Sequence, residues 1–176
     1  MNIKKGLSAA RQRRRLEREF SEYINGFENH SEILEMDKYI QHSDISTLRH
    51  CIHVSYLTFL ICRKFGFIGF NTREAVRGAL VHDMFLYDWH ENSPFTFHGF
   101  KHPRIALANA NRAFGNLSTL EADIILNHMW PLTIYRLPKH KEAYVVSLAD
   151  KICTVMEVMK IRSFKSIDKT VYKKVG

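Results

Sequence analysis

Apolar positions recur every three or four residues along most of the chain, which is the spacing of amphipathic helices rather than of strands. This spacing predicts a basic helix over residues 7–23, a break near Gly26 and a shorter helix over residues 31–40. No Asn-Gly or similar two-residue signal predicts a hairpin. We therefore expect an all-α fold, a bundle of about five or six core helices with basic terminal helices.

Capping residues and a proline mark the ends of the helices that follow. Asn71 with Glu74, and Ser118 with Glu121, have the spacing of a capping box. Pro103 suits the first turn of another helix, because a proline there loses no intrahelical hydrogen bond. The predicted central helices run from Ser46 to near Gly66, from Asn71 to about Phe85, from Pro103 to near Gly115, from Ser118 to Trp130 and from about Lys141 to Ile161, with a loop over residues 87–101.

The length of the chain indicates one core. Its 176 residues are 45% apolar, which is enough for one buried core and too little for two comfortable domains. We predict a basic helical extension over residues 1–44, a helical domain over 45–161 and a basic tail over 162–176. No apolar stretch approaches the roughly 20 residues that cross a bilayer, and the N-terminus lacks the apolar core of a signal peptide. We expect a soluble, cytoplasmic protein without a transmembrane segment.

The cysteines agree with that location. Cys51, Cys62 and Cys153 are odd in number, widely spaced and without a CxxC pair. Disulfides are rare in the cytosol, and free cysteines usually behave as small buried apolar residues. We therefore expect three free thiols on the apolar faces of helices.

The net charge of +8 is concentrated at the two ends of the chain. Residues 1–18 have a net charge of +6, residues 160–176 have +5, and the remaining residues have −3. Basic ends can contact nucleic acid or an anionic membrane surface, but solvated tails or contacts within a homodimer explain them equally well. Aromatic residues are not interleaved with the arginines, so we do not favour a nucleic-acid partner.

Several polar residues stand where the helical pattern predicts burial. His50, His82, His128 and Asp150 each continue an apolar helix face, and Asp83 follows His82 directly. A single buried histidine is usually a hydrogen-bonded core residue, but a buried carboxylate is costly unless it is paired or bound to metal. One metal ion can bind imidazoles and carboxylates from several neighbouring helices. The set therefore points to a buried metal site.

With these residues the sequence resembles the HD-domain metal-dependent phosphohydrolase superfamily, over about residues 46–158. The pair His82-Asp83 ends the segment Gly-Ala-Leu-Val-His-Asp, His50 precedes it, and Asp150 follows in Ser-Leu-Ala-Asp-Lys. The ordered set H…HD…D, each in a helical context, is more specific than the His-Asp pair alone. The resemblance makes residues 45–161 an HD-type metal-binding domain.

The resemblance also implies the ligands and the chemistry. His50, His82, Asp83 and Asp150 would bind one ion, and two further histidines would bind a second ion in binuclear members, with Asp83 as the catalytic, bridging residue. Mixed imidazole and carboxylate ligands suit one or two divalent transition metal ions, Fe, Mn, Zn or Co. A metal-bound hydroxide would then attack phosphorus. The implied ligands are His50, His82, Asp83, His102, His128 and Asp150.

A small phosphorylated substrate, a nucleotide or another metabolite, follows from the same resemblance. Basic side chains beside the implied ligands could bind phosphate oxygens, although a surface charge or a salt bridge explains each of them too. His53, one turn from His50, and His98 could donate hydrogen bonds near the ligands or act as a general acid, and simple packing explains His53 equally well. The aromatic loop over 87–100 could line a nucleobase pocket or cover the core. The candidate phosphate-binding residues are Arg77, Lys101, Arg104 and Lys151.

Two other functions remain open from the sequence. One is a metal-stabilised binding module whose basic ends contact nucleic acid, which predicts salt-dependent binding that survives loss of the carboxylates. The other is a di-iron oxygenase of the same superfamily, because the same six ligands also support oxygen chemistry. Bound iron and dioxygen uptake would distinguish the oxygenase from the hydrolase.

Overall fold

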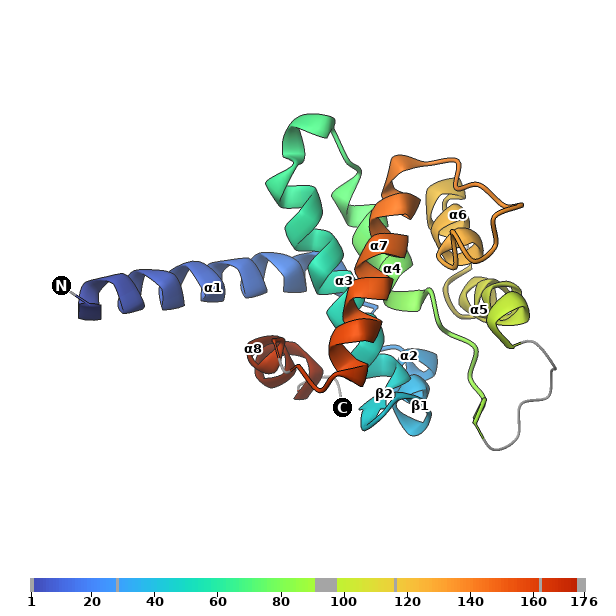
Figure 1. The fold of residues 1–176 in the computed structure, drawn as a ribbon, viewed down its shortest axis with the longest axis horizontal. Coiled ribbons are helices and arrows are strands. Elements are labelled where there is room, and N and C mark those ends of the chain that lie inside the picture. The colour runs from blue at the N-terminus through green and yellow to red at the C-terminus, as the bar shows by residue number, and fades with distance from the viewer. Residues whose placement is uncertain (1, 28, 91–97, 116, 162, 174–176) are drawn as a thin grey trace.

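A computed structural model describes residues 2–27, 29–90, 98–115, 117–161 and 163–173, with the backbone alone for 2–7 and 98. The described chain is mainly helical with one small two-stranded sheet, which confirms the all-α class. Helix α3 (Thr47–Lys64) packs against α4 (Thr72–Val81) and α7 (Lys141–Val158), as Figure 1 shows at the centre of the molecule. Helices α5 (His98–Phe114) and α6 (Thr119–Asn127) lie on one side of this group, and α1 (Asn2–Ile24) projects from the other.

The shorter elements lie before α3, after it and at the end of the chain. Among them, β1 and β2 pair antiparallel, and α8 continues directly into a single π-helical turn, η3. Their bounds are Ser31–Glu35 for α2, Met36–Lys38 for η1, Ile40–His42 for β1, Ile45–Ser46 for β2, Gly66–Ile68 for η2, Lys165–Ile167 for α8 and Asp168–Tyr172 for η3.

Two clusters of buried side chains fill the core, and α3 contributes to both. The first joins α3 and α4 to the last turns of α1, through Phe20 and Ile24, and to the end of the chain, through Ile167 and Val171. The second joins α3 and α4 to α6 and α7. The three cysteines are free and buried in these clusters, as the sequence predicted. The last turns of α1 and residues 167–171 are therefore anchored in the core by apolar side chains.

The predicted capping boxes form only in part. Ser118 and Glu121 make the complete box, in which each side chain accepts a hydrogen bond from the other residue's backbone N–H. Asn71 accepts from the backbone N–H of Glu74, but its own N–H donates to the carboxylate of Glu142 at 2.9 Å. The start of α4 is thus attached to the start of α7, because the backbone donor that a capping box would satisfy locally is satisfied by a neighbouring helix.

The helix predicted over residues 31–40 ends at Lys38, and the hairpin of β1 and β2 follows where no strand was expected. The hairpin turn contains Ser43 with a positive φ of 55°, a conformation that Asn or Gly usually supplies. A Ser-Asp turn does not carry that signal, so the sequence pattern missed the hairpin. Its effect is to place Gln41 and His42 beside α3.

The helix predicted to reach Phe85 ends at Val81. Beyond it the backbone turns, Leu86 adopts a positive φ of 57°, and the side-chain amide of Asn109 donates to the carbonyls of Met84 and Phe85. Hydrogen bonds from a distant helix therefore replace those of a continued helix, and the backbone leaves the helical path directly after His82.

Helix α5 begins at His98, earlier than Pro103 and inside the predicted loop. Pro103 stands inside the helix, where it lacks the N–H that would bind the carbonyl of Gly99. The prediction that Pro103 starts this helix is wrong because one missing hydrogen bond near the first turn does not prevent the helix from beginning upstream.

Candidate metal centre

All six predicted ligands come together at one place in the core. His50 lies in α3, His82 and Asp83 directly follow α4, His102 lies in α5, His128 directly follows α6, and Asp150 lies in α7. Each of the six is buried. Five helices therefore direct imidazole and carboxylate groups at a shared point. The helical pattern predicted the burial of four of these residues, His50, His82, His128 and Asp150, and the family resemblance added His102; their role as ligands stays a prediction.

Asp83 is at the middle of this cluster. Its Oδ2 lies 3.5 Å from Nε2 of His82 and 4.0 Å from Nε2 of His50. Its Oδ1 lies 3.0 Å from Nε2 of His102 and 3.3 Å from Nε2 of His128. One carboxylate thus faces a different pair of histidines with each oxygen.

Asp150 completes one half of the cluster. Its Oδ1 lies 3.2 Å from Nε2 of His50 and 3.8 Å from Nε2 of His82. We call this group, His50, His82 and Asp150 with Oδ2 of Asp83, the His50 side. The His128 side consists of His102 and His128, whose Nε2 atoms lie 2.8 Å apart, with Oδ1 of Asp83.

Backbone carbonyls fix the orientation of two of the rings. Nδ1 of His82 lies 2.7 Å from the carbonyl of Ala79, and Nδ1 of His128 lies 2.8 Å from the carbonyl of Ile125. A carbonyl only accepts, so each Nδ1 carries the hydrogen and donates it. In the neutral imidazole each Nε2 then presents a lone pair to the centre of the cluster, which is the form that binds a metal ion.

The donor set fits a metal ion. Nε2 of His82 and Oδ1 of Asp83 are buried, and neither makes a well-aligned hydrogen bond among the described residues, although Oδ1 lies within 3.3 Å of two imidazole nitrogens. Buried polar atoms are rarely left with poor hydrogen-bond geometry, so two such atoms in one cluster require an explanation. A divalent transition metal ion on each side of Asp83 would use both atoms, and imidazole with carboxylate suits Fe, Mn, Zn or Co.

The charges of the cluster also favour a cation. Burial opposes ionisation of Asp83, but His82 and His102 outweigh it and hold the pKa of the carboxyl well below its usual range. Burial likewise opposes the charged form of His50, but Glu157 and Asp150 raise its pKa to about 10. The carboxylates therefore stabilise positive charge at this point, and a bound metal ion would supply it in place of protons.

Three residues that the sequence did not single out contact the cluster. Glu157, two turns after Asp150 in α7, accepts from Nδ1 of His50 at 2.8 Å. Gln41 donates to Oδ2 of Asp83 at 2.7 Å. His42 lies with its ring 5.4 Å from that of His50, and burial lowers its pKa. Glu157 follows Asp150 by seven residues, a helical spacing that could have identified it in the sequence. Gln41 and His42 lie in the hairpin, which the sequence did not predict.

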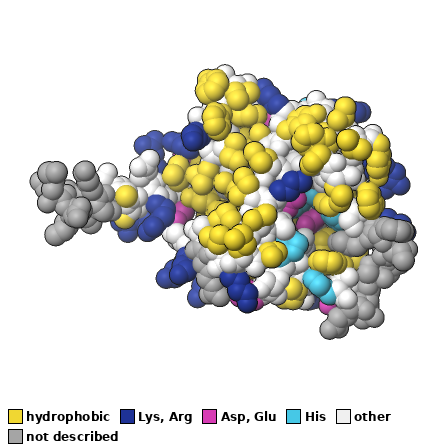
Figure 2. All heavy atoms as spheres, in the orientation of Figure 1, with side chains coloured by type: hydrophobic (Ala, Val, Ile, Leu, Met, Phe, Trp, Pro, Cys, Tyr) yellow, Lys and Arg dark blue, Asp and Glu magenta, His cyan; other side chains and the backbone are white. Residues whose placement is uncertain are grey.

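A cavity of about 440 Å³ opens onto the cluster. Asp83, His102, His128 and Asp150 line its inner end, and an apolar wall is formed by Trp89, Met129, Leu132 and Val155. Histidine and acidic side chains lie together at the surface among hydrophobic side chains on the face shown in Figure 2. The cavity is large enough for a small organic molecule to reach the cluster.

Of the four predicted phosphate-binding residues, the structure brings Lys151 to the cavity. Its Nζ donates to the carbonyl of His128 at 3.0 Å, and burial lowers its pKa. Lys101 and Arg104 are exposed in α5 and do not line the cavity. Arg77 also lies away from the cavity, because it precedes His82 by five positions and so lies about 140° around the helix from it. It forms an ion pair with Glu121 at 3.1 Å and packs on the ring of Phe27.

The remaining candidates from the sequence also lie partly at the cavity and partly away from it. His53 lies outside the cluster, where it contacts Glu157 and Asp168. Trp89 of the predicted aromatic loop lines the cavity. Residues 91–97 of that loop, and the side chain of His98, lie outside the described residues.

The buried histidines and carboxylates of this helical domain form groups that could hold a metal ion. The family model of the HD domain matches residues 47–154, more than half of the chain. The chain therefore belongs to the HD domain family, which confirms the resemblance to the HD-domain metal-dependent phosphohydrolase superfamily. No match to the chain is found among curated proteins or among solved structures.

Proposed function

We propose that this protein is a metal-dependent phosphohydrolase that hydrolyses a phosphoester of a nucleotide or a small phosphorylated metabolite. The observation that carries the proposal is the position of Asp83. Its two oxygens face two separate pairs of histidines at the inner end of a cavity that is open to small molecules. Membership of the HD domain family supports the same reaction class.

In this proposal the His50 side and the His128 side would each hold one divalent ion, and Asp83 would be a ligand on both sides. Bound ions would polarise phosphoryl oxygens and lower the pKa of water, so that a nucleophile is present at neutral pH. No side chain is required as the nucleophile. Asp83 and Asp150 would offset part of the charge of the ions, and the five converging helices would keep the ligands in place.

The cavity walls would then orient the substrate. Lys151 lies beside the cluster and supplies positive charge for a phosphoryl oxygen. Trp89, Met129 and Leu132 offer an apolar surface to the organic part of the ester. This division, a charged inner end and an apolar wall, suits a small phosphoester with one phosphoryl group at the metal cluster.

Substitution Asp83→Asn tests the proposal. Metal ions contribute several kcal/mol to such reactions, and each 1.4 kcal/mol corresponds to about tenfold in rate, so we expect hydrolysis of a panel of nucleotides and aryl phosphates to fall at least about 100-fold. Helical content by circular dichroism should remain. Iron and manganese are quantified in the same samples, and dioxygen uptake is measured in parallel.

Asp123→Asn is the matched control. Asp123 is also buried, but it accepts hydrogen bonds from the backbone of Lys139 and His140, away from the cluster. We expect this variant to keep the metal-dependent turnover of the parent protein. Parent-level turnover in Asp83→Asn would overturn the proposed function.

A further inference from the structure

A row of buried charged groups extends from the metal cluster to the end of the chain. Glu157 lies between two histidines of α3, with Oε2 2.8 Å from Nδ1 of His50 and Oε1 2.9 Å from Nδ1 of His53. Both oxygens of Glu157 are therefore used, one by a candidate ligand and one by a residue outside the candidate ligand set. All three side chains are buried.

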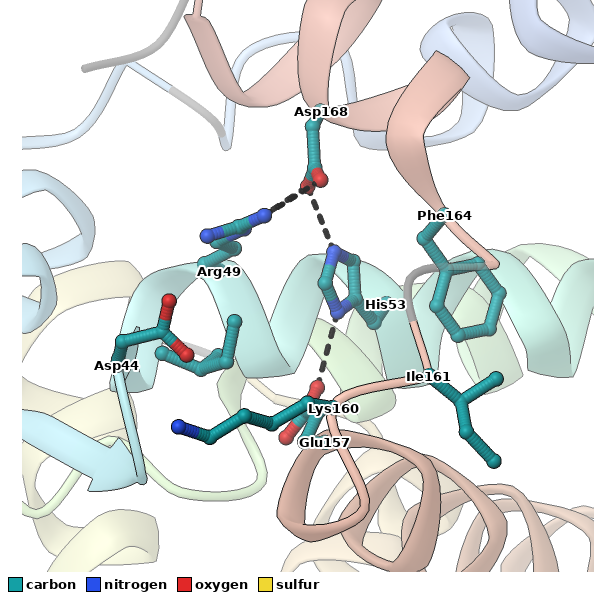
Figure 3. Close-up of a pocket in the computed structure, with 9 residues that line it drawn as sticks. Asp44, Arg49, His53, Glu157, Lys160, Ile161, Phe164 and Asp168 are labelled. Carbon is teal, nitrogen blue, oxygen red and sulfur yellow. Dashed lines mark hydrogen bonds and ion pairs between the residues drawn. The ribbon is translucent and has the colours of Figure 1, made fainter.

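His53 continues the row. Its Nε2 lies 2.7 Å from Oδ1 of Asp168 in η3, as Figure 3 shows. Arg49 binds both oxygens of Asp168, through Nε at 3.1 Å and Nη2 at 2.7 Å. The ring of Phe164 stacks on the ring of His53 at 4.7 Å between centroids. His53 is thus held at both nitrogens and on one ring face.

The segment that supplies Asp168 is anchored independently of this row. Ile167 and Val171 are buried in the first core cluster. Tyr172 donates to Asp37 at 2.7 Å, and Ser166 donates to Glu17 at 2.5 Å. We call residues 165–172 the C-terminal segment. These contacts hold Asp168 in place, and Asp168 in turn holds the ring of His53 through its hydrogen bond.

The hydrogen bond to Glu157 determines which nitrogen of His50 carries the hydrogen. A carboxylate only accepts, so Nδ1 of His50 must donate its hydrogen to Glu157, which leaves Nε2 of the neutral ring with the lone pair that faces Asp150 and Asp83. His82 and His128 obtain the same orientation from backbone carbonyls of their own helical turns. His50 obtains it from a side chain of another helix, which itself needs support.

We propose that Glu157, held by His53 and Asp168, is the positioning residue for His50, so that the C-terminal segment is a functional part of the metal centre although it contributes no ligand. The inference rests on the proposed function in one respect, that an ion binds on the His50 side. It adds that the affinity of that ion depends on residues as far along the chain as 168.

Titration with Co²⁺ alone, followed by its visible absorption, tests the inference in the full chain. In Glu157→Gln the side chain keeps one accepting oxygen but loses the negative charge that strengthens His50 as a metal ligand. Hydrogen-bond partners of metal-bound histidines typically change metal affinity about 10- to 100-fold, and we expect a loss of that size for one ion. The second ion, on the His128 side, should bind with unchanged affinity.

Glu142→Gln provides the matched control. Glu142 is a buried glutamate at the other end of the same helix, and it accepts from the backbone of Asn71 rather than from a histidine. We expect this variant to bind Co²⁺ as the parent does, even where its thermal stability falls. An equal loss in Glu142→Gln and Glu157→Gln would overturn the inference, because the effect would then be general destabilisation.

Asp168→Asn extends the test to the C-terminal segment and serves if Glu157→Gln does not fold. We expect a smaller loss of affinity for the same ion, since the asparagine still accepts one hydrogen bond from His53. Parent-like binding of both ions in a folded Glu157→Gln or Asp168→Asn would overturn the positioning role while leaving the proposed function intact. A parent protein that binds no Co²⁺ would overturn both.

Discussion

Asp83 divides its two oxygens between two pairs of histidines, so the two sides of the cluster should be separable by mutation. We expect His102→Ala and His128→Ala each to lower the metal content of purified protein from about two ions per chain to about one, because each removes a ligand from the same side. Elemental analysis measures this directly. His140→Ala is the control, since His140 contacts Asp123 outside the cluster. Two ions retained in both variants would remove these histidines from the site.

Asp168 should make the stability of the protein sensitive to acid. Burial alone would raise the pKa of Asp168, but His53 and Arg49 outweigh burial and lower it from 3.8 to about 2. A carboxyl whose pKa is lower in the folded state stabilises the fold above its unfolded pKa, and this contribution disappears as the pH falls through the folded value. The stabilisation by Asp168 should therefore be complete above about pH 4 and lost near pH 2.

The measurement is urea unfolding of the parent and of Asp168→Asn with a chelator present, so that metal release does not contribute. We expect the difference in unfolding free energy between the two proteins to be largest near pH 5 and to shrink towards pH 2. Glu22→Gln, at an exposed position of α1, should show no such trend. A difference that stays constant with pH would show that Asp168 acts through packing rather than through its charge.

The candidate ligands could be read from the sequence because burial of a polar residue leaves a signal in the helical pattern. His50, His82 and Asp150 each continue an apolar stripe, and the structure buries all three in one cluster. Which ions they bind stays a prediction. Gln41 and His42 left no such signal, because they reach the cluster through a hairpin whose turn lacks the usual residues.

At the scale of elements, Gly78 of α4 packs directly against Ile124 of α6. A Cβ added at Gly78 would lie 2.9 to 3.2 Å from three atoms of Ile124, a branched side chain with little freedom to move. Overpacking typically costs about 1–3 kcal/mol, while alanine in a helix interior returns about 1 kcal/mol relative to glycine. We expect Gly78→Ala to destabilise the protein by up to about 2 kcal/mol in urea unfolding.

The same change should weaken metal binding, because His82 follows α4 and His128 follows α6. Gly66→Ala serves as the comparison, since a Cβ there meets open space. A Gly78→Ala variant as stable as the parent would contradict tight packing between the two helices.

The ends of helices could be predicted where neighbouring residues in the sequence determine them. They could not be predicted where contacts with another helix determine them. Ser118 and Glu121 specify the start of α6 by themselves, and the structure contains their capping box. The end of α4 depends on Asn109, which lies in another helix and reaches over to bind two carbonyls. The spacing of apolar residues does not reveal a partner in another helix, so the prediction extended α4 to Phe85 instead of Val81.

At the scale of the whole molecule, bound metal should stabilise the fold, because the candidate ligands come from five helices that are far apart in sequence. A ligand that binds only the folded state stabilises it by about 2.7 kcal/mol at 100 times its dissociation constant. We therefore expect saturating Mn²⁺ or Co²⁺ to raise the melting temperature and a chelator to lower it. Asp83→Asn should lose most of this gain, and a gain equal to that of the parent would place the ion elsewhere.

The basic composition of the two ends of the chain did not predict how these ends pack. Residues 1–18 are strongly basic, and the arginines of α1 whose side chains are described are exposed. Their charge explains nothing of the packing, which depends on Phe20 and Ile24 further along the same helix. Among the helices of the described residues, none is both long and apolar enough to cross a bilayer. The division at residues 44 and 161 stays a prediction, although Gln41 and Asp168 on either side of it contact the central domain.

The C-terminal segment has a consequence for biosynthesis. A ribosome adds roughly 5–20 residues per second, and all six candidate ligands are synthesised before Glu157 and Asp168. A nascent chain halted before Lys165 would therefore possess every ligand and still bind the ion of the His50 side weakly. Tight binding of that ion should therefore begin only after Asp168 has emerged from the ribosome. Tight Co²⁺ retention by such a halted chain would contradict this order of events.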